Sequence, residues 1–336
     1  MSKKRGKQSY VLESRPRVAA WASMAGPKEA AGPLGRTFDE TFTDDTLGED
    51  SWERAEARML EHAVDMALSK ARVFADGVDV FLGGDLLNQI VSAGYAARQL
   101  GIPFIGLYGA CSTMAESLLL GSLLLDGGFA DNAVCATCSH FSTAERQYRY
   151  PLELGNQRTP AAQWTVTGAG ATFLTATGDH PIRVEAVTMG RVWDLKQTDA
   201  NNMGAAMAPA AMMTLKSHLG DLGRKPSDYD LIVTGDLGHV GKELMTILCK
   251  REGILLDDRY IDCGCEIFDE TQDAHAGGSG CGCSAVCLNG WLYGRMMKGE
   301  IRRMLFMATG ALMSPTMSQQ GESIPGIAHA VALEVV

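Results

Sequence analysis

One cysteine stands where a buried strand is expected to lead into a buried helix. Cys111 follows the apolar run IPFIGLY and lies among small residues in GACSTMAES, residues 109–117. The N-terminus of a helix offers unpaired N–H groups and lowers the pKa of a nearby thiol. We therefore expect Cys111 to act as a nucleophile or to help hold an anion.

Other polar residues are expected at the carboxyl ends of strands, where open α/β sheets bind their ligands. Asp85 and Asp236 also have a simpler interpretation, because an Asp at a strand-to-helix turn commonly caps the helix that follows. The loop HAGGSGCGCS contains His275, and its glycines let a backbone pass close to a ligand. Thr309 follows a further strand. We predict a ligand-binding site that draws on Cys111, His140, Asp236, His239 and His275.

The nine cysteines raise the question of a metal site. The pairs Cys263–Cys265 and Cys281–Cys283 could supply four thiolates to zinc, but their spacing is not a familiar zinc pattern. We expect no metal site and no cofactor. The sequence shows no export signal, which predicts reduced, mostly packed thiols rather than disulfides.

Composition excludes some classes of protein. The chain has 336 residues, 46% of them hydrophobic, and a formal net charge of −10. That charge argues against a nucleic-acid partner, since a phosphate backbone requires clustered Lys and Arg. No apolar run approaches the roughly 20 residues of a membrane-spanning helix. The basic cluster KKRGK, residues 3–7, would be attracted modestly to an anionic membrane surface.

The sequence also contains an internal repeat. DVFLGGDLL at residues 79–87 matches DLIVTGDLG at residues 230–238. Each block follows a helical stretch, and each is followed by a helix, a Gly-Ile step, a strand, a small-residue loop, an apolar helix and a strand. We predict two similar halves, residues 1–178 and 179–336.

The order of these elements predicts the architecture. Strands that alternate with helices indicate mostly parallel sheets covered on both faces. The stretches 117–126 and 285–297 are apolar nearly all round, which is typical of fully buried helices. We predict an α/β fold of five layers, α-β-α-β-α, whose pseudo-twofold axis brings the loops of Cys111 and His275 together around one cavity.

These motifs resemble the thiolase superfamily, which includes thiolases and ketoacyl synthases. GACSTMAES is similar to its loop with the acyl-accepting cysteine, and HAGGSGCGCSA to its segment with a second-half histidine. The resemblance implies a thiolase-like sandwich and a homodimer paired through the first-half sheets. However, GDLGHVGKEL and the late segment MATGALMSPTMSQQGESIPG depart from the superfamily's active-site motifs. Acyl transfer needs a base and oxyanion donors, so we expect a degenerate, non-catalytic site.

A narrower resemblance is to the stage V sporulation protein AD family of endospore-forming bacteria. AGPLG at 31–35, FDETFTDD at 38–45 and the CGC-containing loop carry it. It implies binding of dipicolinic acid, with or without calcium, during uptake into the developing spore. It further implies a peripheral position on the inner membrane of the forespore or spore, beside the membrane subunits of a channel. An arginine could hold the ligand's carboxylates: the candidates are Arg146, Arg149, Arg158 and Arg191.

Two alternatives stay open. An intact nucleophile loop is compatible with an active thiolase or ketoacyl-synthase-type acyltransferase that uses Cys111. A structural subunit with a vestigial pocket would tolerate Cys111→Ala and His275→Ala without loss of ligand binding.

Overall fold

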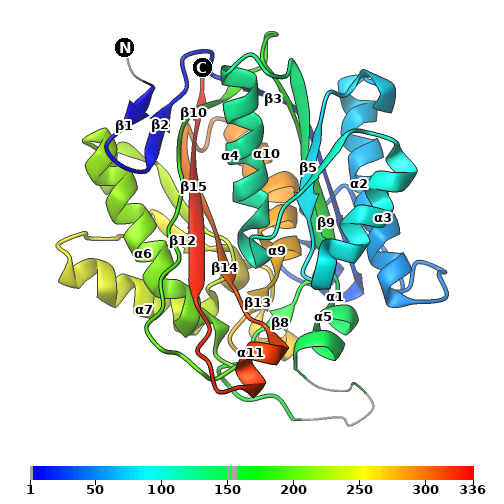
Figure 1. Ribbon diagram of the computed structural model, residues 1–336, viewed down its shortest axis with the longest axis vertical. Coiled ribbons are helices and arrows are strands. Elements are labelled where there is room, and N and C mark those ends of the chain that lie inside the picture. The colour runs from blue at the N-terminus through cyan, green and yellow to red at the C-terminus, as the bar shows by residue number, and fades with distance from the viewer. Residues whose placement is uncertain (1–2, 150–151, 153–156) are drawn as a thin grey trace.

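Two similar half-sheets face each other across a layer of helices in the computed structural model of the chain, which describes residues 3–149, 152 and 157–336 (Figure 1). The first half-sheet has the order β3-β9-β7-β5-β6. Its strands are β3 (Arg17–Ala25), β9 (Gly168–Thr175), β7 (Asn132–Ser139), β5 (Phe81–Gly84) and β6 (Phe104–Gly106).

The second half-sheet repeats this order with β10-β15-β14-β11-β12. Its strands are β10 (Ile182–Thr188), β15 (Gly326–Val335), β14 (Arg303–Ala311), β11 (Leu231–Thr234) and β12 (Tyr260–Asp262). The halves meet where Arg17 of β3 pairs with Arg183 of β10. The same strand order thus occurs on both sides of residues 178 and 179; the two halves as separate units stay a prediction.

The expectation of mostly parallel sheets was wrong. In each half the first three strands pair antiparallel and only the last three pair parallel. The reason is that β9 and β15 run back between two strands of the opposite direction. Such a return cannot be read from the alternation of strands and helices alone.

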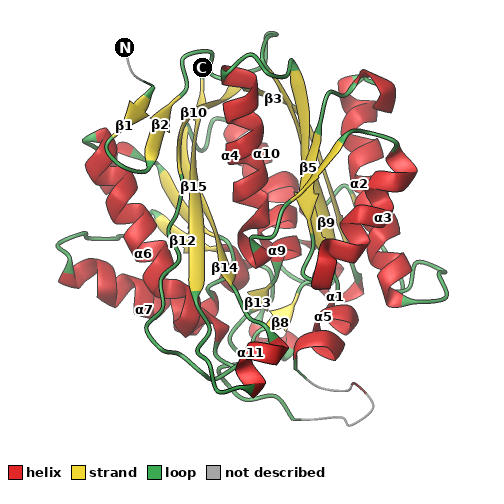
Figure 2. Cartoon of the chain, in the orientation of Figure 1, coloured by secondary structure: helices red, strands yellow, loops and turns green. Residues whose placement is uncertain are grey.

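Short strands complete the sheets, which are yellow in Figure 2. β1 (Lys4–Arg5) pairs with β2 (Ser9–Val11), and β4 (Glu40–Thr41) pairs with β3. A separate parallel pair joins β8 (Trp164–Thr165) to β13 (Gly278–Ser279). This small pair fixes the loop that leads to the second central helix.

The central layer consists of α4 (Thr113–Asp126), α9 (Cys281–Val286), a π-helical turn (Cys287–Leu292) and α10 (Tyr293–Met297). Ten of the fourteen α4 residues and all six of α9 are buried. The structure therefore confirms that both central helices are enclosed. A helix between two sheets has no polar face because neither side meets water.

Outer helices cover the other face of each half-sheet, which gives five layers (Figure 1). α2 (Trp52–Ala71) and α3 (Val91–Leu100) cover the first half; α6 (Met203–Leu222) and α7 (Gly238–Arg251) cover the second. The shorter helices are α1 (Pro27–Ala30), α5 (Phe141–Tyr148), α8 (Cys263–Glu266) and α11 (Pro315–Gln319).

Three hydrophobic cores correspond to these layers. The largest lies between the half-sheets, and one lies under each pair of outer helices. Within the described residues, no helix combines the length and apolar character needed to cross a membrane.

Candidate functional site

A cavity of about 280 Å³ lies at the N-terminal end of α4, where the carboxyl ends of strands from both halves meet. Its apolar wall comes from Leu86, Leu87, Ile90, Ala110, Ala144, Met203, Ala311, Leu312 and Met313. Its polar groups belong to Asp85, Asn88, Gln89, Tyr108, Cys111, Tyr148, Arg149, Thr165 and Ser279. An apolar cavity with a few convergent polar groups is typical of a small-molecule site.

Cys111 is the central residue of a 3-10 turn (Ala110–Ser112) that leads directly into α4. Ala110 is held at φ +50°, a left-handed conformation that is unusual for a residue with a Cβ atom. Strained backbone of this kind often marks a functional site, because surrounding contacts must hold it in place. The strain directs the Cys111 side chain toward the cavity wall formed by the second half.

Asp236 lies against Cys111 from the second half, just after β11. Its carboxylate accepts hydrogen bonds from Thr309 Oγ1 at 2.7 Å and from the Gly280 N–H at 2.8 Å, and the Cys111 thiol also donates to it. Burial outweighs these donors and raises the pKa of Asp236 to about 7. Asp236 is therefore bound across the fold rather than capping α7, a role that Asp262 fills through the N–H groups of Leu237 and Gly238.

The expected lowering of the Cys111 pKa was wrong. Burial raises the pKa of the thiol well above its ordinary value, and the nearby carboxylate of Asp236 raises it further. The Gly280 N–H opposes this increase but does not reverse it. The pKa-lowering effect of the helix N-terminus is outweighed because desolvation and a like charge both disfavour the thiolate. Cys111 is thus a neutral thiol at pH 7.

Asp85 lies at the equivalent strand end in the first half. Its oxygens accept the N–H groups of Leu87 at 2.7 Å and Ala93 at 2.6 Å, so the simpler capping interpretation describes it well. Burial raises the pKa of Asp85 to about 6. Glu56 lies near it, and burial together with the charge of Asp85 raises the pKa of Glu56 too. The acid that lines the cavity, Asp85, and the one beside it, Glu56, therefore both resist ionisation.

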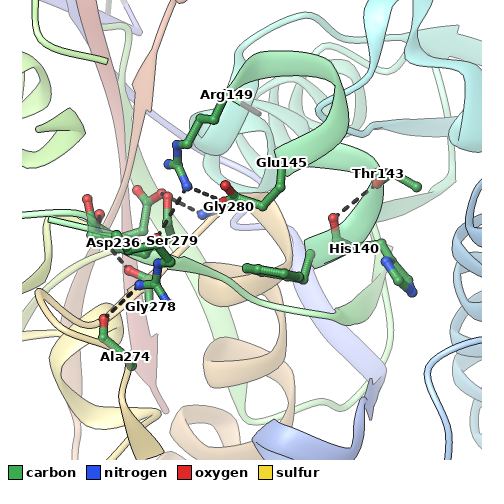
Figure 3. Close-up of polar contacts among 12 residues, drawn as sticks. His140, Thr143, Glu145, Arg149, Asp236, Ala274, Gly278, Ser279 and Gly280 are labelled. Carbon is green, nitrogen blue, oxygen red and sulfur yellow. Dashed lines mark hydrogen bonds and ion pairs between the residues drawn. The ribbon is translucent and has the colours of Figure 1, made fainter. Parts of the chain in front are cut away.

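Arg149 is the arginine that lines the cavity. It follows α5 and forms an enclosed ion pair with Glu145, with side chains only 7% and 4% exposed. Arg149 also donates to the Gln163 carbonyl oxygen at 3.3 Å, while its Nε–H is buried without a partner. Figure 3 shows the guanidinium extending from α5 toward Ser279 and Gly280. The Nε–H is sealed from solvent, whereas the residue lines the cavity, so the guanidinium offers its charge and planar donor geometry to an anion there.

The other candidate arginines lie elsewhere. Arg146 pairs with Glu53 at the surface. Arg158 stacks over Trp164 and donates to backbone carbonyl groups of Asp273 and Ala274. Arg191 is exposed.

His140 is buried, but both of its ring nitrogens are occupied. Nδ1 accepts the Ser142 N–H at 3.1 Å and caps α5, and Nε2 lies 2.7 Å from the Asp45 carbonyl oxygen. Burial lowers the pKa of His140, which favours the neutral ring. The imidazole points away from the Ser279–Gly280 turn (Figure 3) and is not among the cavity-lining residues.

His239 and His275 line a second hollow of about 450 Å³ together with Cys265, not the cavity of Cys111. His275 is paired with Asp273 at 2.9 Å, and its Nδ1 lies 2.7 Å from the Thr159 carbonyl oxygen. A ligand-binding role for His140, His239 or His275 stays a prediction. The structure does not bring these histidines to Cys111.

The geometry of the glycine loop explains this separation. From His275 the chain passes through β13 and reaches α9 at Cys281, with Gly277 at φ +103° and Gly280 at φ +99°. Five residues of extended chain span about 16 Å. Ser279 lies two residues before α9, just as Cys111 lies two residues before α4. Ser279 rather than His275 is therefore the counterpart of Cys111. The helix starts do meet, as predicted, but the histidine lies further back.

Tyr148 and Ser279 line the cavity although no motif indicated them, and of the four candidate arginines Arg149 is the one that lines it. The spacing of Glu145 and Arg149, four residues apart on a helix, predicts an ion pair. Nothing in that spacing indicates which cavity the pair faces. Within the part of the chain that the structure describes, no cluster of three His, Cys, Asp or Glu residues could hold a metal ion.

Similarity to solved structures identifies the fold. 3-Oxoacyl-[acyl-carrier-protein] synthase III from Aquifex aeolicus aligns over 95% of this chain and 99% of its own, with a TM-score of 0.57 and 14% identity. A variant of OleA from Xanthomonas campestris aligns over 95% and 97%, with a TM-score of 0.60 and 14% identity. These alignments confirm the thiolase-like α/β fold; at such low identity they show the fold alone.

Similarity at the sequence level is closer. Stage V sporulation protein AD of Bacillus subtilis (strain 168) is 48% identical over 330 residues, which cover 98% of this chain and 97% of that protein. The family model for stage V sporulation protein AD matches residues 6–334. Because the family model matches nearly the whole chain and the identity to this relative is 48%, the chain belongs to the stage V sporulation protein AD family.

Proposed function

We propose that this chain binds dipicolinic acid, a small aromatic dicarboxylate, in the cavity above Cys111 without transforming it, and that this binding serves uptake into the developing spore. Membership of the family supports a role in sporulation. The observation that carries the ligand proposal is the enclosed guanidinium of Arg149 in the wall of an apolar cavity. Arg and a flat carboxylate match well in geometry.

The size and walls of the cavity support a small ligand. About 280 Å³ lies near the lower end of the range for small-molecule sites, roughly 300–1,000 Å³. The side chains of Leu87, Ile90 and Met313 offer apolar surface to an aromatic ring. Tyr148 contributes a phenol that stays neutral, because burial raises its pKa to about 12.

The charges around the cavity favour a ligand that binds together with a cation or a proton. The charge of Arg149 is already balanced by Glu145, and Asp85 and Asp236 lie at the cavity floor and behind Cys111. A dianion alone would add negative charge to this setting, whereas a calcium complex of the ligand or a protonated ligand would add less. We therefore propose tighter binding when Ca²⁺ is present.

The surroundings of Cys111 support binding without catalysis. A nucleophilic thiol needs a base or a lowered pKa. Here its neighbour is a carboxylate that raises the thiol pKa, and no histidine occurs among the described residues that line the cavity.

Isothermal titration calorimetry with dipicolinate tests this proposal. We expect saturable binding at one site per chain, strengthened by Ca²⁺ and weakened in Cys111→Trp, which would fill the cavity. Cys249→Ala, at a buried cysteine within α7, is a matched control that should bind normally. Absence of heat with the ligand, both with and without Ca²⁺, would refute the binding function.

One observation favours a second candidate, an acyltransferase that uses Cys111. The left-handed Ala110 presents the thiol at the start of α4, in a fold shared with acyl-transferring synthases. Incubation with acyl-coenzyme A donors followed by peptide mass spectrometry distinguishes the two. An acyl group on Cys111 would support the second candidate, and an unmodified thiol would support binding alone.

We propose a homodimer and membrane subunits of a spore channel as partners. The edge strand β6 leaves Ile105 half-exposed, with Tyr108 and Tyr95 exposed close by in the chain. An unpaired edge with apolar side chains is a ready surface for strand pairing between two copies. Light scattering of the full chain should give twice the chain mass, and Ile105→Lys should reduce it to a monomer.

We further propose a peripheral position on the inner membrane of the forespore or spore.

A further inference from the structure

Two phenylalanines project from the end of the sandwich opposite the cavity. Among the described large apolar side chains, Phe74 and Phe129 are the most exposed, at 84% and 83%. Phe129 follows the C-terminus of α4, whose N-terminal end adjoins Cys111. Phe74 follows the C-terminus of α2. Two large aromatic side chains exposed at one end of the molecule offer apolar surface to a partner.

The turns that carry these rings are well ordered. After α4, Gly128 is left-handed at φ +72°, and the Phe129 N–H donates to the Leu124 carbonyl at 2.9 Å. This is the helix-ending turn in which the residue at that position often packs back on the helix. Here the Phe129 ring lies beside Gly127 at the end of the helix and still remains 83% exposed. After α2, left-handed Arg72 makes a similar turn immediately before Phe74.

The two turns are tied to each other. Asp79 accepts the N–H groups of Asp131 at 2.7 Å and Asn132 at 3.1 Å. The side chain of Asn132 in turn accepts the Asp79 N–H at 3.0 Å and donates to the Gly77 carbonyl at 3.1 Å. Phe74 and Phe129 therefore belong to one braced surface, and little conformational entropy is lost when that surface binds something.

Basic residues flank the same end. Lys3 is paired with Asp126 at 2.9 Å, which ties the N-terminal strands to the end of α4 (Figure 1). Lys4, Lys7, Arg15 and Arg72 are exposed there, against the exposed acids Glu13, Asp76, Asp131 and Asp179. Basic residues are concentrated along the β1–β2 segment although the chain as a whole carries −10.

We propose that Phe74, Phe129 and the basic residues of β1 form a docking surface for an anionic lipid bilayer. Exposed aromatic rings insert at the level of the headgroups, and Lys and Arg are attracted to the negative surface. This surface deepens the proposed peripheral membrane position and depends on it. In that orientation the mouth of the Cys111 cavity faces the water, so a dissolved ligand can enter it from there.

Vesicle co-sedimentation of the full chain tests the surface. With phosphatidylglycerol–phosphatidylcholine vesicles at low salt we expect binding that falls sharply in 0.5 M salt or with phosphatidylcholine alone, on the order of tenfold. Phe74→Ser/Phe129→Ser and Lys4→Glu/Arg5→Glu should each lower the bound fraction about tenfold. Leu195→Ser is the matched control, since Leu195 is 64% exposed on the loop that follows β10, at the other end of the sandwich.

Each outcome has one meaning. Loss of binding in both double variants with normal binding of the control supports the surface. Failure of the wild-type chain to sediment with anionic vesicles overturns it, as does undiminished binding of the Phe variant. If a protein subunit rather than a bilayer covers this face, the wild-type chain should fail to sediment with anionic vesicles. Dipicolinate titration of the same variants should be normal, so a failure here is distinct from a failure of the ligand proposal.

Discussion

Arg149 and Cys111 line the same cavity, but their surroundings give them different chemical roles. Arg149 is enclosed and paired with Glu145, and its Nε–H is buried without a partner. Cys111 is enclosed beside a carboxylate that disfavours its thiolate. Arg149 is therefore suited to bind an anion, whereas Cys111 adds a neutral, polarisable surface to the cavity wall.

Arg149→Lys should weaken binding of dipicolinate by roughly tenfold or more. Lysine keeps the charge that balances Glu145 but loses the planar guanidinium and its fork of donors. Calorimetry checks the affinity, and circular dichroism checks the fold. Arg146→Lys is the control, because Arg146 pairs with Glu53 at the surface, away from the cavity. Equal affinity of Arg149→Lys and the wild type would show that Arg149 does not contact the ligand.

Cys111 should react slowly with iodoacetamide at pH 8. Burial and Asp236 raise the thiol pKa, and the thiolate is the species that reacts. Asp236→Asn removes the negative charge and should speed the alkylation several-fold at the same pH. Peptide mass spectrometry follows Cys111 separately from the other eight cysteines. A rate in the wild type equal to that of a free cysteine would contradict the raised pKa.

At the level of elements, the site depends on how closely loops from the two halves approach. Gly310, in β14, lies against the turn before α4: a Cβ atom there would come within 2.4 Å of the Gly109 carbonyl oxygen and 3.1 Å of the Ser112 nitrogen. Both are backbone atoms, which cannot rotate away. The absent side chain is what lets β14 reach the Cys111 turn.

Gly310→Ala should therefore lower the free energy of unfolding by about 1–3 kcal/mol and disturb the cavity. Gly94→Ala is a matched control within α3, where a Cβ atom meets nothing within 4 Å. That change should instead raise the free energy of unfolding, by up to about 1 kcal/mol, since alanine favours helix. Urea unfolding measures both. Equal stability of the two variants would argue against the close approach.

At the level of the whole molecule, buried acids give the fold an unusual dependence on pH. Burial raises the pKa of Glu29 and Asp236 to about 7 and that of Asp85 to about 6, and it raises the pKa of Glu56 as well. Between pH 4 and 7 the unfolded chain loses these protons while the folded chain still keeps them. Stability contributed by these groups is therefore complete below pH 4 and is lost as the pH rises through 6 and 7.

Differential scanning calorimetry should show a lower unfolding temperature at pH 8 than at pH 5. Asp194 and Asp269 have lowered pKa values and act in the opposite direction, but solvent reduces their weight. The buried His140, His218 and His329, whose pKa values burial lowers, also act in the opposite direction, and we expect the buried acids to outweigh them. Asp85→Asn should flatten the dependence because it removes one of the groups that titrate. A higher unfolding temperature at pH 8 than at pH 5 would contradict the prediction.

The sequence by itself determined the five-layer α/β fold, the enclosed central helices and the position of Cys111 at a helix start. These features follow from local hydrophobic periodicity and from an order of elements that occurs twice. Only the tertiary structure decided that β9 and β15 run antiparallel, that Arg149 lines the cavity with Asp236 behind Cys111, and that His275 lies in another hollow. The physical reason is that each of these depends on segments distant in the chain: the pairing of β13 with β8, the left-handed glycines beside it, and the side on which α5 packs.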